Sequence, residues 1–341
     1  MNIHQLISNL LKNSECLLGL YNNYYRLKNS KTFWEEQKKR KSLSFFDFEN
    51  VASDMHFCPI EKIKDSNYYG HAYALKQYCG YKNVNAAIEH GLYLGDRVTN
   101  AELLKTTKKV IAMSQNRIDS FKKNGCFKPI YAIGPYIHYA SPFLTKDEEL
   151  SIKRQLGKVL LVFPFHSSKH EKASFDLDFL VQKIESIKKD YNTVMVCLHH
   201  NDITMNPRYT REYQRLGYTI VSAGHKFDFM FLSRLKSIIS LSDFVLSNSI
   251  GTHVGYCTYL NKPQIILDDD SSLSALKDSA YNDFSEQIAR KQTLEIMNAY
   301  GEESLGRITP RQLSVAEKYW GVSKVLTKEG MYKLLIELEQ E

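Results

Sequence analysis

Histidine, hydroxyl and amide side chains gather where apolar runs of the second half of the chain end. They follow the runs at 159–163 and 244–246, and they are His166, Ser167, Ser168, Ser247, Asn248, Ser249 and Thr252. In doubly wound sheets, ligands bind beyond the carboxyl ends of the strands. We therefore expect these residues to converge on one binding site.

The segment 247–253 reads as a strand end, a small polar turn and a helix start. Backbone N–H groups at a helix N-terminus attract anions, and nearby hydroxyl groups add donors. Serine and asparagine are also preferred N-caps, so a purely structural role stays open. The net charge of +7 favours the anion-binding interpretation.

Three further strand ends carry histidine or acidic residues. His225 lies in a loop that a bound ligand would pass, and His166 either donates to a phosphate or carboxylate or occupies a turn. His199 and His200 are adjacent at a strand end and point in opposite directions, so a shared metal is not expected. The run at 268–270 has Asp-x-Asp spacing, which can hold Mn²⁺ or Mg²⁺ on a diphosphate, but a solvated loop fits its late position better.

Cofactor motifs are absent from the sequence. There is no GxGxxG after the first strand, no GxxxxGK[ST] and no GxSxG elbow. Nicotinamide dehydrogenases and P-loop NTPases are thereby disfavoured. We expect neither a cofactor nor a metal.

In the first half, Glu89 and His90 close the apolar segment 84–88 ahead of Gly91. If the two halves oppose each other, either side chain could face the cleft and deprotonate an acceptor hydroxyl. An ordinary helix end with Gly91 as its cap is the alternative. His138, after the apolar segment 129–135, would border the same cleft.

The elements that position these residues alternate between strands and helices. Apolar runs predict strands at 109–114, 129–135, 159–163, 194–198, 218–222, 244–247 and 263–267, with amphipathic helices between them. The charged helix at 145–154 marks the boundary. We predict two Rossmann-like doubly wound α/β domains that face a cleft, at 1–150 and 151–341, with helical N- and C-terminal segments.

Composition limits the classes of function. The 341 residues carry 45 Lys plus Arg and 38 Asp plus Glu, which is too weak and dispersed a positive charge to indicate nucleic acid. The six scattered cysteines and the lack of a signal-like N-terminus favour a cytoplasmic protein. No stretch is apolar enough to span a bilayer. The basic run at 38–41 is a solvated helix face or a peripheral contact with the anionic inner face of the plasma membrane.

These two halves, the Glu-His-Gly loop and the Ser-Asn-Ser-Ile-Gly-Thr-His turn resemble glycosyltransferases of the GT-B fold. The resemblance covers about residues 80–270 and is nearest to bacterial enzymes that build capsular polysaccharide and lipopolysaccharide. The His and Ser clusters are also similar to those of sialyltransferase-like and polysialyltransferase-like enzymes, which use CMP-linked acidic sugars. The Glu-x7-Glu pattern of many retaining enzymes is absent from the second half, which favours inversion.

The resemblance implies a role for each candidate residue. The second half would bind a nucleotide-sugar donor, with its phosphate held by His166, Ser167, Ser168, Ser247, Asn248, Ser249 and Thr252 and with His225 nearby. The first half would bind a glycan or lipid-linked glycan acceptor, with His90 or Glu89 as general base. No bound metal would be needed, because helix dipoles and side chains stabilise the leaving phosphate.

Two other classes of protein remain open. A sugar-nucleotide epimerase of similar build would convert a donor without any acceptor. A catalytically inactive GT-B-like module would bind a polysaccharide or a partner and turn over nothing.

Overall fold

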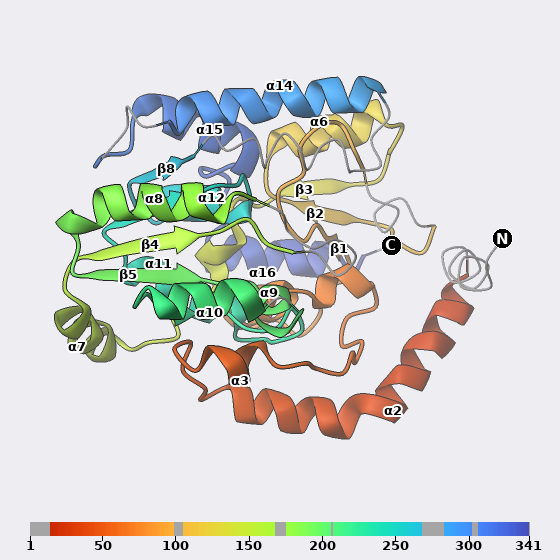
Figure 1. Cartoon of the computed structure of the whole chain (residues 1–341). Coiled ribbons are helices and arrows are strands. Elements are labelled where there is room, and N and C mark those ends of the chain that lie inside the picture. The colour runs from red at the N-terminus through yellow and green to blue at the C-terminus, as the bar shows by residue number, and fades with distance from the viewer. Residues whose placement is uncertain are drawn as a thin grey trace.

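The computed structural model describes residues 14–98, 105–167, 175–205, 207–267, 283–301 and 306–340. Two parallel sheets lie side by side, each flanked by helices (Figure 1). The described strands of the first sheet are β1 (Ala87–Ile88), β2 (Val110–Ala112) and β3 (Ile130–Ala132), in that order. Those of the second sheet run β6-β5-β4-β7-β8, and they are β4 (Val159–Phe163), β5 (Thr193–Cys197), β6 (Thr219–Val221), β7 (Phe244–Ser247) and β8 (Gln264–Ile266). The predicted α/β class with two Rossmann-like halves is confirmed.

The second sheet is buried on both faces because helices cover each side. Along β4, Leu160 and Val162 pack in one apolar cluster, and Val159, Leu161 and Phe163 pack in the other. The first cluster includes α8 (Leu177–Ile187) and α10 (Pro207–Arg215), and the second includes α11 (Phe231–Leu241) and α12 (Thr252–Tyr259). Period-2 alternation within an unbroken apolar run explains why this strand could be predicted.

The strand order reverses between β4 and β7. From β4 the chain continues to β5 and β6 on one side, and it later returns to β7 and β8 on the other. The loops that follow β4 and β7 therefore diverge, and a crevice opens between them at the carboxyl ends of the strands. Sequence analysis placed its main candidate residues on these two loops.

The first half has shorter strands. The apolar segment 84–88 yields only the two residues of β1, which pair with β2 through Ala87 and Ile88. Its helical elements are η1 (Lys64–Asn67), α4 (His71–Cys79), α6 (Gln115–Lys123) and η2 (Tyr136–Tyr139). Helix α6 lies between β2 and β3, as the predicted alternation of strands and helices requires.

Both ends of the chain pack across the halves. Near the N-terminus, α2 (Glu15–Arg40) leads to α3 (Phe48–Ala52), which packs on α9 (His200–Met205) of the second half. The N–H groups of Ser222 and His225 donate to the carbonyls of Phe45 and Val51, at 3.0 Å each. The N-terminal segment is thus part of the second half's surface.

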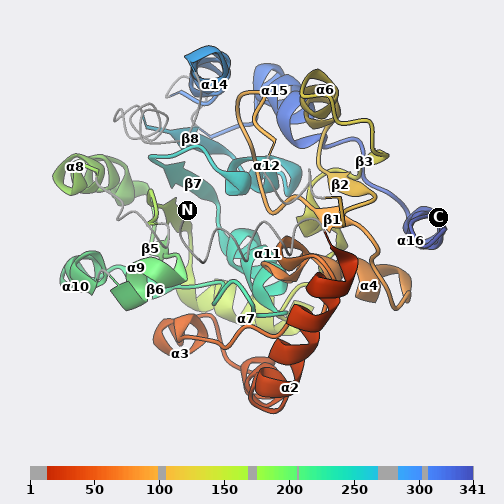
Figure 2. The same cartoon turned by 90° about the vertical axis from the view of Figure 1, so that its right-hand side faces the viewer.

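The C-terminal helices, which follow the second sheet in sequence, pack on helices of the first half. After α14 (Asp283–Ala299), α15 (Pro310–Trp320) packs on both α12 and α6, and α16 (Lys328–Glu337) packs on α4 (Figure 2). Trp320 fits against Gly255 of α12, where an added Cβ would lie 2.0 Å from the indole Cγ. Gly255 is therefore required for this packing.

The predicted boundary helix is α7 (Lys146–Leu156), and its N-terminus has a capping box. The Thr145 hydroxyl accepts from the Glu148 N–H, and the Glu148 carboxylate accepts from the Thr145 N–H. The boundary between residues 150 and 151 falls inside α7 and stays a prediction, because terminal helices pack across both halves. In the described part of the chain, no helix is both long and apolar enough to cross a bilayer.

Candidate functional site

A cavity of about 340 Å³ lies between the two halves. The first half contributes Tyr69, His71, His90, Gly91 and Leu92 to its lining. The second half contributes the segments that follow β4, β5 and β7, together with residues of α11. The cavity therefore lies where the reversal of strand order predicts a ligand site.

The turn between β7 and α12 is held by two buried polar side chains. The Ser247 hydroxyl accepts from the Ser249 N–H at 3.1 Å and lies 3.0 Å from His253 Nε2. The Asn248 Oδ1 accepts from the Phe165 N–H at 2.7 Å, which ties the loop after β4 to the turn. Neither Ser247 nor Asn248 lines the cavity, so both support the turn, and their contact with a phosphate stays a prediction.

The helix start predicted within 247–253 lies at Thr252. Residues 249–251 form the turn, in which the Ser247 hydroxyl bonds both the N–H and the carbonyl of Ser249. Ser249, Gly251, Thr252 and His253 line the cavity at the start of α12. This is the end of a helix that favours anions.

A direct contact joins the two halves at this point. The Leu92 N–H donates to the Thr252 Oγ1 at 2.9 Å. A Cβ added at Gly91 would lie 2.6 Å from the same oxygen. Gly91 therefore allows the loop after β1 to approach the start of α12 closely.

Four histidine rings lie in a continuous row of ring contacts beside the cavity, of which only the contact between His166 and His199 is stacked. His166 lies 4.5 Å from His199, His199 lies 4.1 Å from His200, and His200 lies 4.5 Å from His225, measured between ring centroids. Of these four, His166 and His199 line the cavity. The expectation that His199 and His200 point in opposite directions is wrong, because His200 begins α9 and does not continue the strand. His225 connects to the cavity through His200 and His199, and its place beside a bound ligand stays a prediction.

Burial keeps most of these imidazoles neutral. It lowers the pKa of His200 to about 2 and that of His225 to about 3, with nearby cationic groups acting in the same direction. It also lowers the pKa of His199 well below its usual value. A neutral imidazole offers one donor and one acceptor, so these rings can hydrogen-bond without bringing charge.

His90 lines the cavity from the first half, as predicted. Its Nδ1 lies 2.8 Å from the Tyr93 hydroxyl. Burial lowers the pKa of His90, Asp65 opposes that shift, and Lys226 adds to it. The ring is therefore neutral near pH 7 and able to accept a proton.

Glu89 is turned away from the cavity. Its carboxylate is 1 % exposed and accepts two hydrogen bonds from Arg117 of α6, at 3.0 Å from Nε and 2.6 Å from Nη2. Burial raises the pKa of Glu89, and Arg117 counters that effect. The Arg117 guanidinium also lies 5.1 Å from the centre of the Tyr93 ring, so Glu89 reaches His90 only through Arg117 and Tyr93.

Sequence reasoning missed two cavity histidines. His71 begins α4 and lies at the cavity wall, with Nδ1 buried and without a hydrogen-bond partner, and burial lowers its pKa to about 3. His253 stacks on Phe163 at 4.6 Å, and its pKa is also lowered to about 3 by burial. His253 stood in the quoted motif, whereas no predicted strand precedes His71. His138 bonds Tyr78 and Tyr259 and does not line the cavity.

Other candidates have different settings. Ser167 is buried, and its N–H donates to Asp202 Oδ1 at 3.0 Å. Ser168 and the aspartates at 268–270 lie outside the described residues. Within the described ranges, no group of three or more His, Cys, Asp or Glu side chains is arranged to hold a metal ion.

Comparisons with known proteins yield structures of similar layout only. No protein-family model matches the chain, and no curated protein matches it. One similar structure is the UDP-GlcNAc 2-epimerase of Neisseria meningitidis bound to UDP-GlcNAc, at 15% identity and a TM-score of 0.36, with 78% of this chain and 73% of that chain covered. Another is S. aureus MnaA with UDP, at 13% identity and a TM-score of 0.40, with 92% and 83% covered. A third is the wall teichoic acid polymerase TagF, at 15% identity and a TM-score of 0.40, with 75% of this chain and 69% of that chain covered. Such values assign no activity to this chain.

Proposed function

We propose that this protein is a glycosyltransferase that moves a sugar from a nucleotide donor to a hydroxyl group of a glycan acceptor. The observation that carries the proposal is the cavity at the switch point, where His90 of one half faces the start of α12 in the other. The donor phosphate would lie against Ser249, Gly251 and Thr252. Helix N-termini bind phosphate through backbone N–H groups and the helix dipole.

In the proposed reaction, the acceptor oxygen attacks the anomeric carbon and the bond from that carbon to the nucleotide phosphate breaks. His90 takes the proton of the attacking hydroxyl. For this role the Nδ1–H donates to the Tyr93 hydroxyl oxygen at 2.8 Å, and the lone pair that accepts the proton is on Nε2, which lies 3.3 Å from the same oxygen. A single displacement of this kind inverts the anomeric centre.

The partners follow from the same assignment. Neutral histidines beside the cavity can donate to the leaving phosphate without a metal, so we propose metal-independent transfer. The donor nucleotide is open, and a CMP-linked acidic sugar is one candidate. We propose a capsular or lipopolysaccharide-type glycan, free or lipid-linked, as acceptor, at the cytoplasmic side of the membrane.

A ligand screen tests the donor site first. UDP, GDP, CMP and CDP would each be added in a thermal-shift assay. A site saturated at about 100 times its Kd gains about 2.7 kcal/mol of stability, which raises the melting temperature measurably. If none of the four nucleotides shifts the melting temperature, the proposal is wrong.

A product assay then separates the alternatives. The matching nucleotide-sugar would be incubated with and without an acceptor glycan, in EDTA. Transfer that needs the acceptor supports the proposal. Conversion of the donor without an acceptor indicates an epimerase, and binding without any turnover indicates an inactive module.

A further inference from the structure

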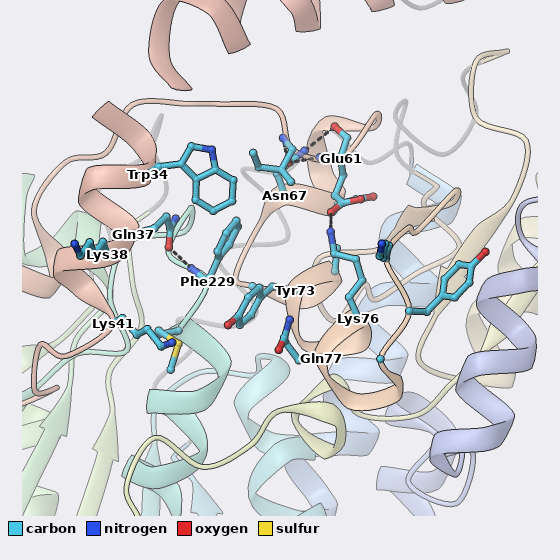
Figure 3. A pocket seen from close by; sticks show the side chains of 18 residues that line it. Trp34, Gln37, Lys38, Lys41, Glu61, Asn67, Tyr73, Lys76, Gln77 and Phe229 are labelled. Carbon is cyan, nitrogen blue, oxygen red and sulfur yellow. Dashed lines mark hydrogen bonds and ion pairs between the residues drawn. The ribbon is translucent and has the colours of Figure 1, made fainter. Parts of the chain in front are cut away.

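A second hollow, of about 610 Å³, lies outside the interdomain cavity, between α2, α4 and the segment 229–230 (Figure 3). We call it the outer groove. Its aromatic lining residues include Trp34, Tyr73 and Phe229, and its lysines are Lys38, Lys41, Lys76 and Lys82. A volume in the range of about 300–1,000 Å³ is typical of small-molecule sites.

The outer groove and the cavity share one wall. Along 69–73, Tyr69 and His71 line the cavity, whereas Gly70, Ala72 and Tyr73 line the groove. In the segment 229–232, residues 229 and 230 line the groove, and residues 231 and 232 line the cavity. The two segments touch at Gly70, whose φ is 68° and where an added Cβ would lie 2.5 Å from the Phe229 carbonyl oxygen.

The floor of the outer groove is preformed. The Gln37 side chain donates to the Phe227 carbonyl at 2.7 Å and accepts from the Phe229 N–H at 3.1 Å. Tyr73 stacks on Phe229, with ring centroids 4.8 Å apart and planes 5° from parallel. Trp34 meets the same phenylalanine edge-on and is 49% exposed. Exposed aromatic surface of this kind marks binding sites, and the C–H faces of sugar rings pack on it.

The charge of the groove is positive and largely unopposed. Glu61 is its one acidic lining residue, and it already pairs with Lys76. Among the described residues, no carboxylate pairs with Lys38, Lys41 or Lys82. These ammonium groups are available to an anionic ligand.

The basic run at 38–41 is therefore not one uniform face. Lys38 in the last turn of α2 and Lys41, the C-cap of that helix, are three residues apart and both line the groove. Arg40 is buried, and its guanidinium donates to the carbonyls of Val51 at 2.6 Å and Ser53 at 2.8 Å. Lys39 is exposed and does not line the groove.

We propose that the outer groove binds an anionic oligosaccharide. Sugar rings pack on Trp34 and Tyr73, and phosphate or carboxylate groups of the chain contact Lys38, Lys41 and Lys82. The aromatic residues line a hollow, which suits a narrow polymer better than a flat bilayer. That this glycan is the acceptor rests on the proposed function, whereas its binding does not.

Fluorescence of Trp34 reports the binding directly. The chain has two tryptophans, and Trp320 is fully buried. The full chain, without nucleotide, would be titrated with sulfated maltohexaose, hexagalacturonate and unmodified maltohexaose. We expect the anionic sugars to change Trp34 emission with a salt-sensitive affinity, and the neutral one to bind at least about tenfold more weakly.

Charge variants supply the matched control. The double variant Lys38→Gln/Lys41→Gln should weaken binding of the anionic sugars by roughly 3- to 30-fold, because each exposed charge contact is modest. Lys39→Gln changes the same charge on the same helix and should leave the affinity within about twofold. Equal effects of the two changes would overturn the groove assignment.

Two other outcomes contradict the proposal. One is the absence of a fluorescence change with both anionic sugars up to millimolar concentration. The other is binding to phosphatidylglycerol vesicles, but not to phosphatidylcholine vesicles or to any sugar, which would indicate a membrane contact instead. Because no donor is present, a failed nucleotide screen would overturn the transferase and leave this result standing.

Discussion

The interdomain cavity and the outer groove lie on opposite sides of one wall, and their linings differ in kind. The cavity is lined by histidines, hydroxyl groups and apolar side chains and by no lysine, arginine, aspartate or glutamate of the described residues. The groove is lined by four lysines and one glutamate. Burial explains the difference, because a charge is costly to bury without a partner.

The contrast suggests a division of tasks. Neutral, buried imidazoles can move or share a proton, which is what a reacting hydroxyl requires. Exposed ammonium groups attract an anion at a distance but are too solvated to change its chemistry. We infer that the chemical step takes place in the interdomain cavity and that the outer groove only binds the anionic ligand.

The largest expected effect is on turnover in the cavity. His90→Ala should lower the rate of transfer by about 10²–10⁴-fold, because a general base is lost, while donor affinity is unchanged. The rate at saturating donor and a nucleotide titration would measure the two effects. His56→Ala, at an exposed position, is the control. A His90→Ala enzyme with normal turnover would move the base elsewhere, with His138 and His166 tested next.

Glu89→Gln should act on stability rather than on chemistry. It leaves the Arg117 guanidinium buried without its carboxylate, which costs about 3–5 kcal/mol in the free energy of unfolding. Urea denaturation would measure the loss. Glu329→Gln, which breaks an exposed pair with Lys333, should change that free energy by less than about 1 kcal/mol. Lost turnover in a stable Glu89→Gln protein would restore Glu89 as a catalytic candidate.

Acid should destabilise the protein because buried histidines that line the interdomain cavity, such as His71, take up protons when the chain unfolds. The pKa of His71 is about 3 when folded and its ordinary value is about 6.5, so the unfolded chain binds more protons between these limits. Stability is therefore complete above about pH 6.5 and falls as the pH drops, by up to about 1.4 kcal/mol per pH unit for each such histidine. His71→Gln should flatten that slope in urea titrations from pH 7 to pH 5. Lys38→Gln in the groove should leave the slope unchanged, and equal slopes for all three proteins would contradict the assignment.

The smallest of these effects is on donor affinity. Ser249→Asp places a negative charge at the start of α12 and should weaken nucleotide binding about tenfold or more. Ser249→Asn, which is similar in size and neutral, is the control for folding and for sterics. Titration of the nucleotide identified by the thermal-shift screen would measure both. Equal affinities for the two variants would remove this turn from the donor site.

The second half was predictable because its signals are local. Strand β4 is one unbroken apolar run, and the polar residues of the turn after β7 are consecutive in the sequence. Both signals could be placed on a parallel sheet by the general rule for strand ends. The four histidines His166, His199, His200 and His225 meet because β4, β5 and β6, which they follow, end at the same edge of the sheet.

The rest depends on pairings between distant segments. Glu89 was expected at the cleft, but its partner Arg117 lies 28 residues further along the chain on α6, and that pairing holds the carboxylate away from the cavity. His71 reaches the cavity from a helix start that no strand precedes. The groove combines segments near 34–41, 60–82 and 229–230, and nothing in their local patterns indicates that they meet.

The crossing of the chain ends limits how the protein can move. Helix α15 holds α12 of one half and α6 of the other at once, and Trp320 is locked over Gly255. A wide hinge opening between the two halves would have to break these contacts of α15 or move α15, α12 and α6 together. The first half, expressed alone as residues 1–150, would lose α15 and α16, which pack on its helices α6 and α4. We therefore expect a ligand to reach the interdomain cavity without a wide opening between the two halves.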